Sequence, residues 1–76
     1  MTHDNNLIRM ANQIGTFFES MPDREQALRD IAMHLKKFWD PRMRKAFLAQ
    51  VEQAPPDPAV SAIVRTAVVE HRALIE

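Results

Sequence analysis

The sequence predicts an all-α fold, a small bundle of about four short helices in a single domain over residues 1–76. Apolar residues recur at the three- and four-residue spacing of helices, and no stretch alternates long enough to indicate a strand. Capping and proline signals divide the chain into helices at about 6–20, 23–38, 41–53 and 58–75. Short connections between them favour antiparallel neighbours.

The first helix is predicted from one apolar stripe, with Asn5 or Asn6 as its cap and Pro22 at its end. Ile8 lies away from the centre of this stripe. Gly15 falls within the helical pattern and indicates either a close approach between helices or a tolerated cost of about 1 kcal/mol. At about 100° per residue, the stripe contains Leu7, Met10, Ala11, Ile14, Phe17, Phe18 and Met21.

The second and third helices each begin after an aspartate. Asp23 is the predicted N-cap of the second helix, and Gln26 would complete a capping box. Asp40 and Pro41 predict the start of the third, a capping carboxylate followed by proline at the first helical position. The two stripes contain Leu28, Ile31, Ala32, Leu35, Phe38 and Trp39, and then Met43, Phe47, Val51 and Ala54. We therefore expect Phe38 and Trp39 in the core.

The fourth helix follows a break at Ala54-Pro55-Pro56, the linker-like stretch of the chain. Asp57 and Pro58 repeat the start signal and are predicted to open it. Its apolar residues are Val60, Ile63, Val64, Ala67, Val68, Leu74 and Ile75.

Composition excludes several classes of protein. A chain of 76 residues with 4 Phe and 1 Trp has little core from which to build an active-site pocket, so we expect no enzyme activity from it alone. The absence of cysteine excludes disulfides, thiolate metal sites and a cysteine nucleophile. His3, His34 and His71 are not clustered with carboxylates, so no metal site and no cofactor is predicted. No stretch approaches the roughly 20 apolar residues of a membrane span, which predicts a cytoplasmic protein without a membrane partner.

A formal net charge of zero hides a strongly basic segment at residues 36–45. Its local charge is +4, from Lys36, Lys37, Arg42, Arg44 and Lys45 against Asp40. Three interpretations stay open: a solvated helix junction, docking onto an acidic protein surface, and contact with nucleic acid. The last is the weakest, because net neutrality argues against it and because Phe38 and Trp39, expected in the core, would not be free to stack on bases.

Three apolar residues lie away from the predicted stripes, namely Ile8, Met33 and Val69. In so small a domain they indicate a surface for a partner. A homodimer of the isolated chain is a possible alternative.

The chain resembles the delta subunit of NAD-dependent formate dehydrogenase in Arg9-Met10-Ala11-Asn12-Gln13-Ile14, in Phe17-Phe18 and in His34-Leu35-Lys36-Lys37-Phe38-Trp39-Asp40-Pro41-Arg42-Met43-Arg44. It departs from that family at Ala54–Asp57, where a more glycine-rich turn is expected. The resemblance implies a non-catalytic accessory subunit of a cytoplasmic complex. Its large subunit oxidises formate at a molybdenum or tungsten pterin centre, and other subunits carry iron–sulfur clusters, flavin and NAD. The delta subunit would support assembly, stability or pterin-cofactor loading.

Docking on the large catalytic subunit is expected to involve Arg9, Asn12, Gln13, Lys37, Arg42 and Arg44. Arginines at the junction can bind carboxylates or backbone carbonyls through two parallel hydrogen bonds. The alternative for Arg42 and Arg44 is local pairing with Asp40 or with a neighbouring helix end. The alternative function is a small helical nucleic-acid-binding or regulatory module that uses the basic patch Lys36–Lys45.

Overall fold

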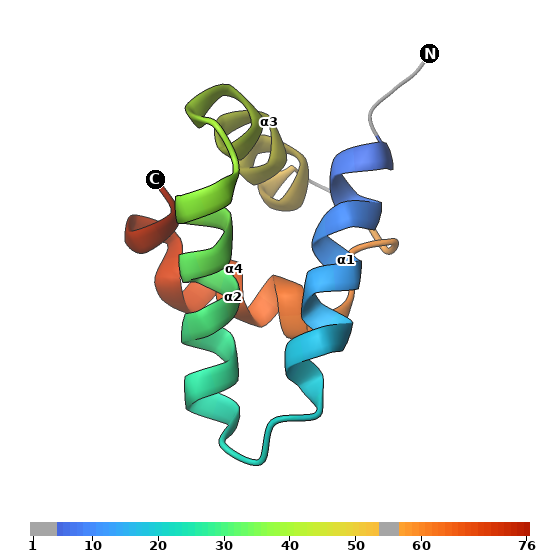
Figure 1. Ribbon diagram of the computed structural model, residues 1–76. Coiled ribbons are helices and arrows are strands. Elements are labelled where there is room, and N and C mark those ends of the chain that lie inside the picture. Colours follow the sequence, from blue (N-terminus) through green and yellow to red (C-terminus); the bar gives the residue numbers. More distant parts are fainter. Residues whose placement is uncertain (1–4, 54–56) are drawn as a thin grey trace.

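The computed structural model describes residues 5–53 and 57–76, and these contain four helices and no strand (Figure 1). They are α1 (Asn5–Glu19), α2 (Arg24–Phe38), α3 (Pro41–Glu52) and α4 (Ala62–Ile75). Helices α1 and α2 form an antiparallel hairpin, α4 crosses behind both, and α3 lies at the end of the hairpin away from its turn (Figure 1). The predicted all-α class is therefore confirmed.

Two helix starts follow the predicted capping chemistry. The Asp23 carboxylate accepts a hydrogen bond from the backbone N–H of Gln26 at 3.2 Å. The Asp40 carboxylate accepts one from the N–H of Met43 at 2.9 Å, and Pro41 opens α3. The reciprocal half of the capping box does not form, because the Gln26 side chain donates instead to Asp30 at 2.8 Å.

Helix α4 begins later than predicted, at Ala62 with Ser61 as its N-cap. The Asp57 carboxylate accepts a hydrogen bond from the Ala59 N–H at 2.9 Å, and the N–H of Val60 donates to the Asp57 carbonyl at 3.3 Å. An aspartate that bonds to the backbone two residues later closes a turn. The Asp-Pro signal therefore starts a turn here, and the helix follows it.

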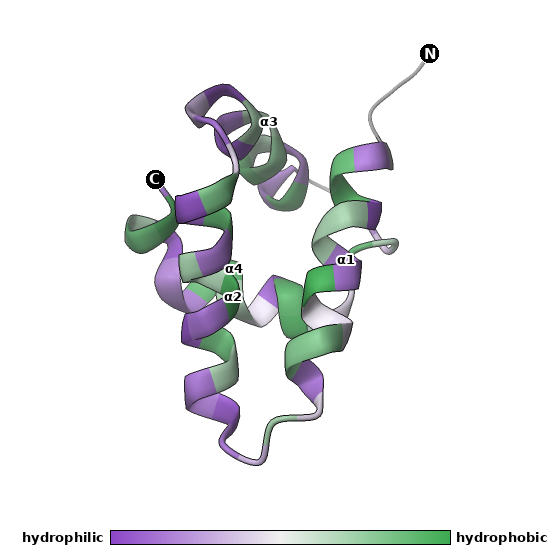
Figure 2. Cartoon of the chain, in the orientation of Figure 1, coloured by the Kyte–Doolittle hydropathy of each residue, from purple (hydrophilic) through white to green (hydrophobic). Residues whose placement is uncertain are grey.

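The core lies between the hairpin, α3 and α4, and the most extensive helix packing is that of α2 on α4. Its largest fully buried side chains are Phe47, Ile31, Leu35, Ile63, Ile75, Val64 and Val68. Trp39 is buried as expected, with its ring edge-to-face against Phe47 at 5.5 Å between centroids. Hydrophilic residues colour much of the visible side of α2 (Figure 2), as expected of a helix with one buried face.

Gly15 marks a close approach between α1 and α4. A Cβ atom at this position would lie 2.7 Å from Cγ2 of Val64 and 3.1 Å from Cγ2 of Ile63. The close-approach interpretation of this glycine is thus confirmed.

The buried face of α1 differs from the predicted stripe. Ile8, expected off the stripe, is 3% exposed, whereas Phe17, expected on it, is 74% exposed. Because α1 meets α4 at Gly15, its buried face centres on Ile8, Ala11 and Gly15, at helical spacing. The core assignment of Phe38 is also wrong: it ends α2 and is 72% exposed.

The other two apolar residues that were expected away from the stripes differ in how far they are exposed. Val69 is exposed on α4, whereas Met33 is half-buried on α2.

Candidate functional site

Four cationic side chains are exposed around the α2–α3 junction and form what we call the basic cluster: Lys36, Lys37, Arg42 and Lys45. The one acidic residue of this segment, Asp40, uses its carboxylate to cap α3. Within residues 5–53 and 57–76, the ion pairs all involve Arg72 and none involves the cluster. The basic cluster is therefore left without an acidic partner in the described part of the chain.

Arg44 has an internal role instead of the exposed docking position that we expected. It is 9% exposed, and its guanidinium donates to the Trp39 carbonyl at 2.6 Å. Longer hydrogen bonds reach the carbonyls of Lys36 at 3.4 Å and Glu76 at 3.3 Å. Arg44 thus ties the end of α2 and the end of α4 to α3, which agrees with the alternative of pairing with a helix end.

Asn12 is likewise engaged within the chain. Its amide nitrogen donates to the Ala59 carbonyl at 2.8 Å, and its amide oxygen accepts from the Ser61 N–H at 3.0 Å. These bonds hold the segment before α4 against α1. They satisfy one of the N–H groups that a helix start leaves unpaired.

The other four expected docking residues are exposed: Arg9 and Gln13 on α1, Lys37 near the end of α2, and Arg42 in the first turn of α3. Lys37 and Arg42 belong to the basic cluster. Arg9 and Gln13 are four residues apart and so share one side of α1.

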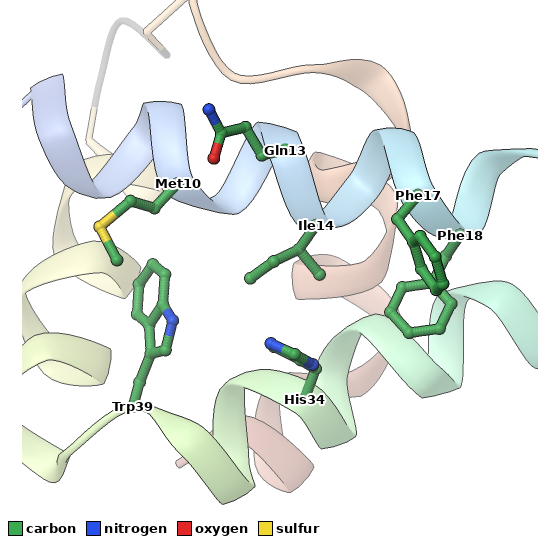
Figure 3. A pocket seen from close by; sticks show the side chains of 7 residues that line it. All are labelled: Met10, Gln13, Ile14, Phe17, Phe18, His34 and Trp39. Atoms are coloured by element: carbon green, nitrogen blue, oxygen red, sulfur yellow. The ribbon is translucent and has the colours of Figure 1, made fainter.

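A groove of about 390 Å³ lies between α1 and α2, and we call it the α1–α2 groove. Its lining residues are Met10, Gln13, Ile14, Phe17, Phe18, His34 and Trp39 (Figure 3). Aromatic rings continue along one side: Phe17 stands edge-on to Phe18 at 5.0 Å between centroids, Phe18 lies 6.4 Å from His34, and His34 lies 4.8 Å from Phe38.

Sequence reasoning missed this groove because it assigned the apolar residues of α1 to one buried face. The signal was present, however. Ile8 and the stripe that contains Met10, Ile14 and Phe17 together spread over too much of the helix surface for one neighbouring face to cover. The apolar surface of α1 is wider than the core can cover, so part of it remains exposed.

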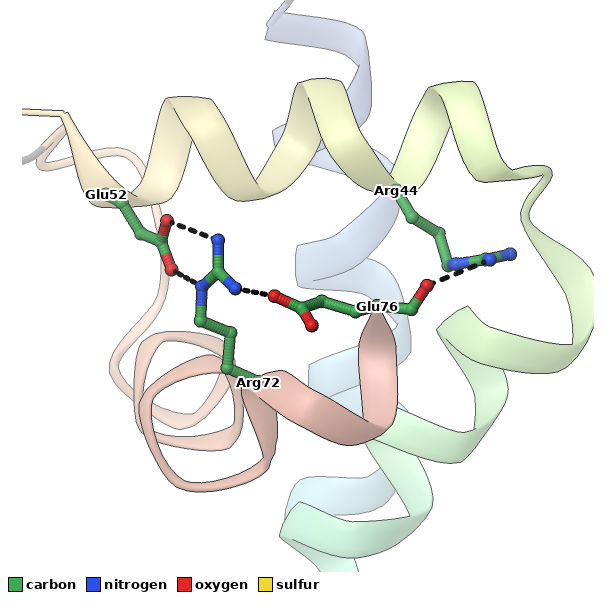
Figure 4. Close-up of polar contacts among 4 residues, drawn as sticks. All are labelled: Arg44, Glu52, Arg72 and Glu76. Atoms are coloured by element: carbon green, nitrogen blue, oxygen red, sulfur yellow. Dashed lines mark hydrogen bonds and ion pairs between the residues drawn. The ribbon is translucent and has the colours of Figure 1, made fainter.

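A second polar arrangement joins α3 to the end of α4 (Figure 4). Arg72 contacts Glu52 through two hydrogen bonds, one of them 3.1 Å long, and also pairs with Glu76. The hydrogen bonds from Arg72 hold the pKa of the Glu52 carboxyl below its ordinary value, and those to Glu52 raise the pKa of Arg72, while slight burial opposes both shifts. The side chains of Arg72, Glu52 and Glu76 are exposed, and together they form a surface ion-pair network between α3 and the end of α4.

No three histidine, cysteine or acidic side chains come together as a metal-binding group in the part of the chain that the structure describes. His34 faces aromatic rings, and His3 lies outside the described residues. Among the described helices, none is both long enough and apolar enough to traverse a bilayer. The described surface presents exposed cations at the α2–α3 junction and an apolar groove between α1 and α2.

Comparison with known proteins places this surface within a family. A family model described as NADH-dependent formate dehydrogenase delta subunit FdsD matches residues 6–68. The match spans α2, α3 and most of α1, so it includes both the basic cluster and the α1–α2 groove. No curated protein and no solved structure shows a significant match. Since the family model covers most of the chain, the protein belongs to the family of formate dehydrogenase delta subunits.

Proposed function

We propose that this protein is a non-catalytic accessory subunit that docks on the large catalytic subunit of a formate dehydrogenase complex. Docking would support the assembly or stability of that subunit, or its loading with the pterin cofactor. Membership of the delta-subunit family carries the proposal. The unneutralised basic cluster supplies a surface suited to docking.

The electrostatic argument concerns the cluster as a group. One exposed ion pair contributes only about 0.2–1 kcal/mol, so a single lysine would not hold a subunit. Several cations on one surface guide an acidic partner into position and select against basic ones. Arg42 adds a planar fork that can bind a carboxylate through two hydrogen bonds.

Pull-down of the tagged chain from the source cells tests this proposal. We expect the large subunit to co-purify in stoichiometric yield at moderate salt. The variant Lys37→Glu/Arg42→Glu should lose it, whereas Arg24→Glu/Arg29→Glu, an equal charge change at exposed positions of α2 toward its start, should retain it. Equal retention by both variants would contradict docking through the cluster.

A further experiment distinguishes a role in cofactor loading from a role in assembly or stability. The large subunit is purified from cells with and without this chain, and its pterin content and its yield are measured. Loss of pterin at unchanged yield indicates cofactor loading, and loss of yield indicates assembly or stability.

A second candidate, nucleic-acid binding, is favoured by one observation. Phe38 is exposed beside Lys37, so it is free to stack on a base, contrary to the expectation that it is buried. Recovery of nucleic acid instead of an enzyme subunit, with binding that weakens steeply as salt rises, would support this alternative.

A further inference from the structure

The exposed apolar side chains of this protein are concentrated at the α1–α2 groove. Four large hydrophobic residues are exposed in the described chain: Met10, Phe17, Phe38 and Val69. Met10 and Phe17 line the groove, and Phe38 packs on His34, which also lines it. Only Val69 lies elsewhere. Exposed apolar side chains that gather around a concave surface are typical of a recognition site.

The groove also presents a hydrogen-bond donor, the indole N–H of Trp39. Trp39 is 6% exposed, and its indole N–H donates to no acceptor in the described part of the chain. The indole nitrogen is not among the fully buried polar atoms that lack a partner, so solvent reaches it from the groove. The indole nitrogen lies on the side of the ring that faces Ile14 and His34 (Figure 3). An occupant that covers this N–H would have to supply an acceptor in place of water.

Positive charge lies near one end of the groove. At the Trp39 end stand Lys37, one helical turn beyond His34, and Arg42, in the first turn of α3. Neither is paired with a carboxylate within residues 5–53 and 57–76. An occupant with acidic groups at this end would match the groove both in polarity and in charge.

We propose that the α1–α2 groove receives the apolar face of an acidic amphipathic helix from another polypeptide of the formate dehydrogenase complex. This inference rests on the proposed docking function and names the surface that performs it. One large apolar side chain of that helix enters between Met10, Ile14 and Phe17. A carbonyl or carboxylate oxygen accepts the Trp39 indole N–H, and acidic side chains meet Lys37 and Arg42. This is the helix-in-groove mode of recognition.

A second copy of the chain fits the groove less well. Outside the groove, the described surface exposes one large hydrophobic side chain, Val69, which is too little to form the apolar face of an inserted helix. The described part of a second copy could then offer only its own groove, and two concave surfaces do not fill each other. The partner is therefore a different polypeptide.

The test uses Phe17→Ser with Val69→Ser as its matched control. Phe17 is 74% exposed and Val69 is 73% exposed, so neither change removes core packing. Far-UV circular dichroism and thermal unfolding check that both variants fold like the native chain. Phe38→Ser is a second groove variant at an equally exposed position.

Binding is measured by titrating the isotope-labelled full chain with the purified large subunit. The chain has 1 Trp, so a single indole N–H resonance in the NMR spectrum reports directly on the groove. We expect this resonance to shift or broaden on addition of the partner. Phe17→Ser should weaken binding by roughly tenfold or more, as expected for a central aromatic anchor, and Val69→Ser should leave it unchanged within about twofold.

The outcomes separate the two proposals. If the native chain binds the large subunit but Phe17→Ser binds as tightly as Val69→Ser and the indole resonance does not respond, the groove inference is overturned and the docking function stands. If the native chain binds no formate dehydrogenase subunit, both fail. If the indole resonance instead changes with the concentration of the chain alone, and Phe17→Ser converts a dimer to a monomer, the occupant is a second copy and the proposed helix is wrong.

Discussion

Replacement of Arg44 by methionine tests the internal role that the structure gives to this arginine. Methionine keeps most of the aliphatic stem and removes the guanidinium, so the change isolates the hydrogen bonds. Three carbonyl groups would lose their donor, those of Trp39, Lys36 and Glu76.

The expected loss follows from the geometry. The bond to the Trp39 carbonyl is 2.6 Å long, buried and made by a charged donor, for which about 1.5–3 kcal/mol is typical. The bonds to Lys36 and Glu76 are 3.4 and 3.3 Å long and contribute less. We expect Arg44→Met to lower the free energy of unfolding by about 3 kcal/mol, which corresponds to roughly 12–24 °C in Tm for a domain of this size.

Urea unfolding followed by far-UV circular dichroism provides the measurement. The control is Arg42→Met, on the same helix but exposed, which should stay within about 0.5 kcal/mol of the native chain. Arg44→Lys should fall between them, because an ammonium group lacks the fork that reaches separate carbonyls. If Arg44→Met is no less stable than Arg42→Met, the reasoning that makes Arg44 a link between helix ends is refuted.

Two further predictions concern the packing of α4. Gly15→Ala should destabilise the fold by about 1–2 kcal/mol in urea unfolding, because overpacking against the stiff, buried Val64 outweighs the gain in helix propensity; equal or greater stability would show that α1 and α4 separate easily. The pKa of Glu52 is lowered in the folded state, so its pairing with Arg72 stabilises the fold above the ordinary carboxyl pKa, and this contribution is lost as the pH falls through the lowered value. Glu52→Gln should therefore reduce the fall in Tm between neutral and acidic pH, and an unchanged pH profile would contradict the pairing.

Local features of this chain could be predicted from the sequence with good accuracy. Asp23 and Asp40 cap their helices as expected, because a carboxylate and the N–H three residues later are brought together by the first turn alone. The delta-subunit family, too, could be identified from short stretches, and the family match confirms it. Information of this kind lies within a few neighbouring residues.

Errors arose where the outcome depended on a distant segment. Asp57 carries the same start signal as Asp40, but the segment before α4 is held by Asn12, forty-nine residues before Ser61, and the helix begins beyond it. Distant segments also decide which of the candidate docking residues form hydrogen bonds within the chain. Asn12 and Arg44 find acceptors inside the fold, whereas Lys37 and Arg42 find none within residues 5–53 and 57–76.

The sequence by itself determined that this protein is helical, where α2 and α3 begin, and which family it belongs to, because spacing, caps and motifs are properties of adjacent residues. Only the tertiary structure decided which face of α1 is buried and which apolar side chains remain outside. Because Gly15 lets α4 approach α1 closely, the buried face of α1 is the one that carries Ile8. Phe17 lies outside that face, at the groove. Periodicity shows that a helix has an apolar face, but burial depends on how much of that face the neighbouring helices can cover.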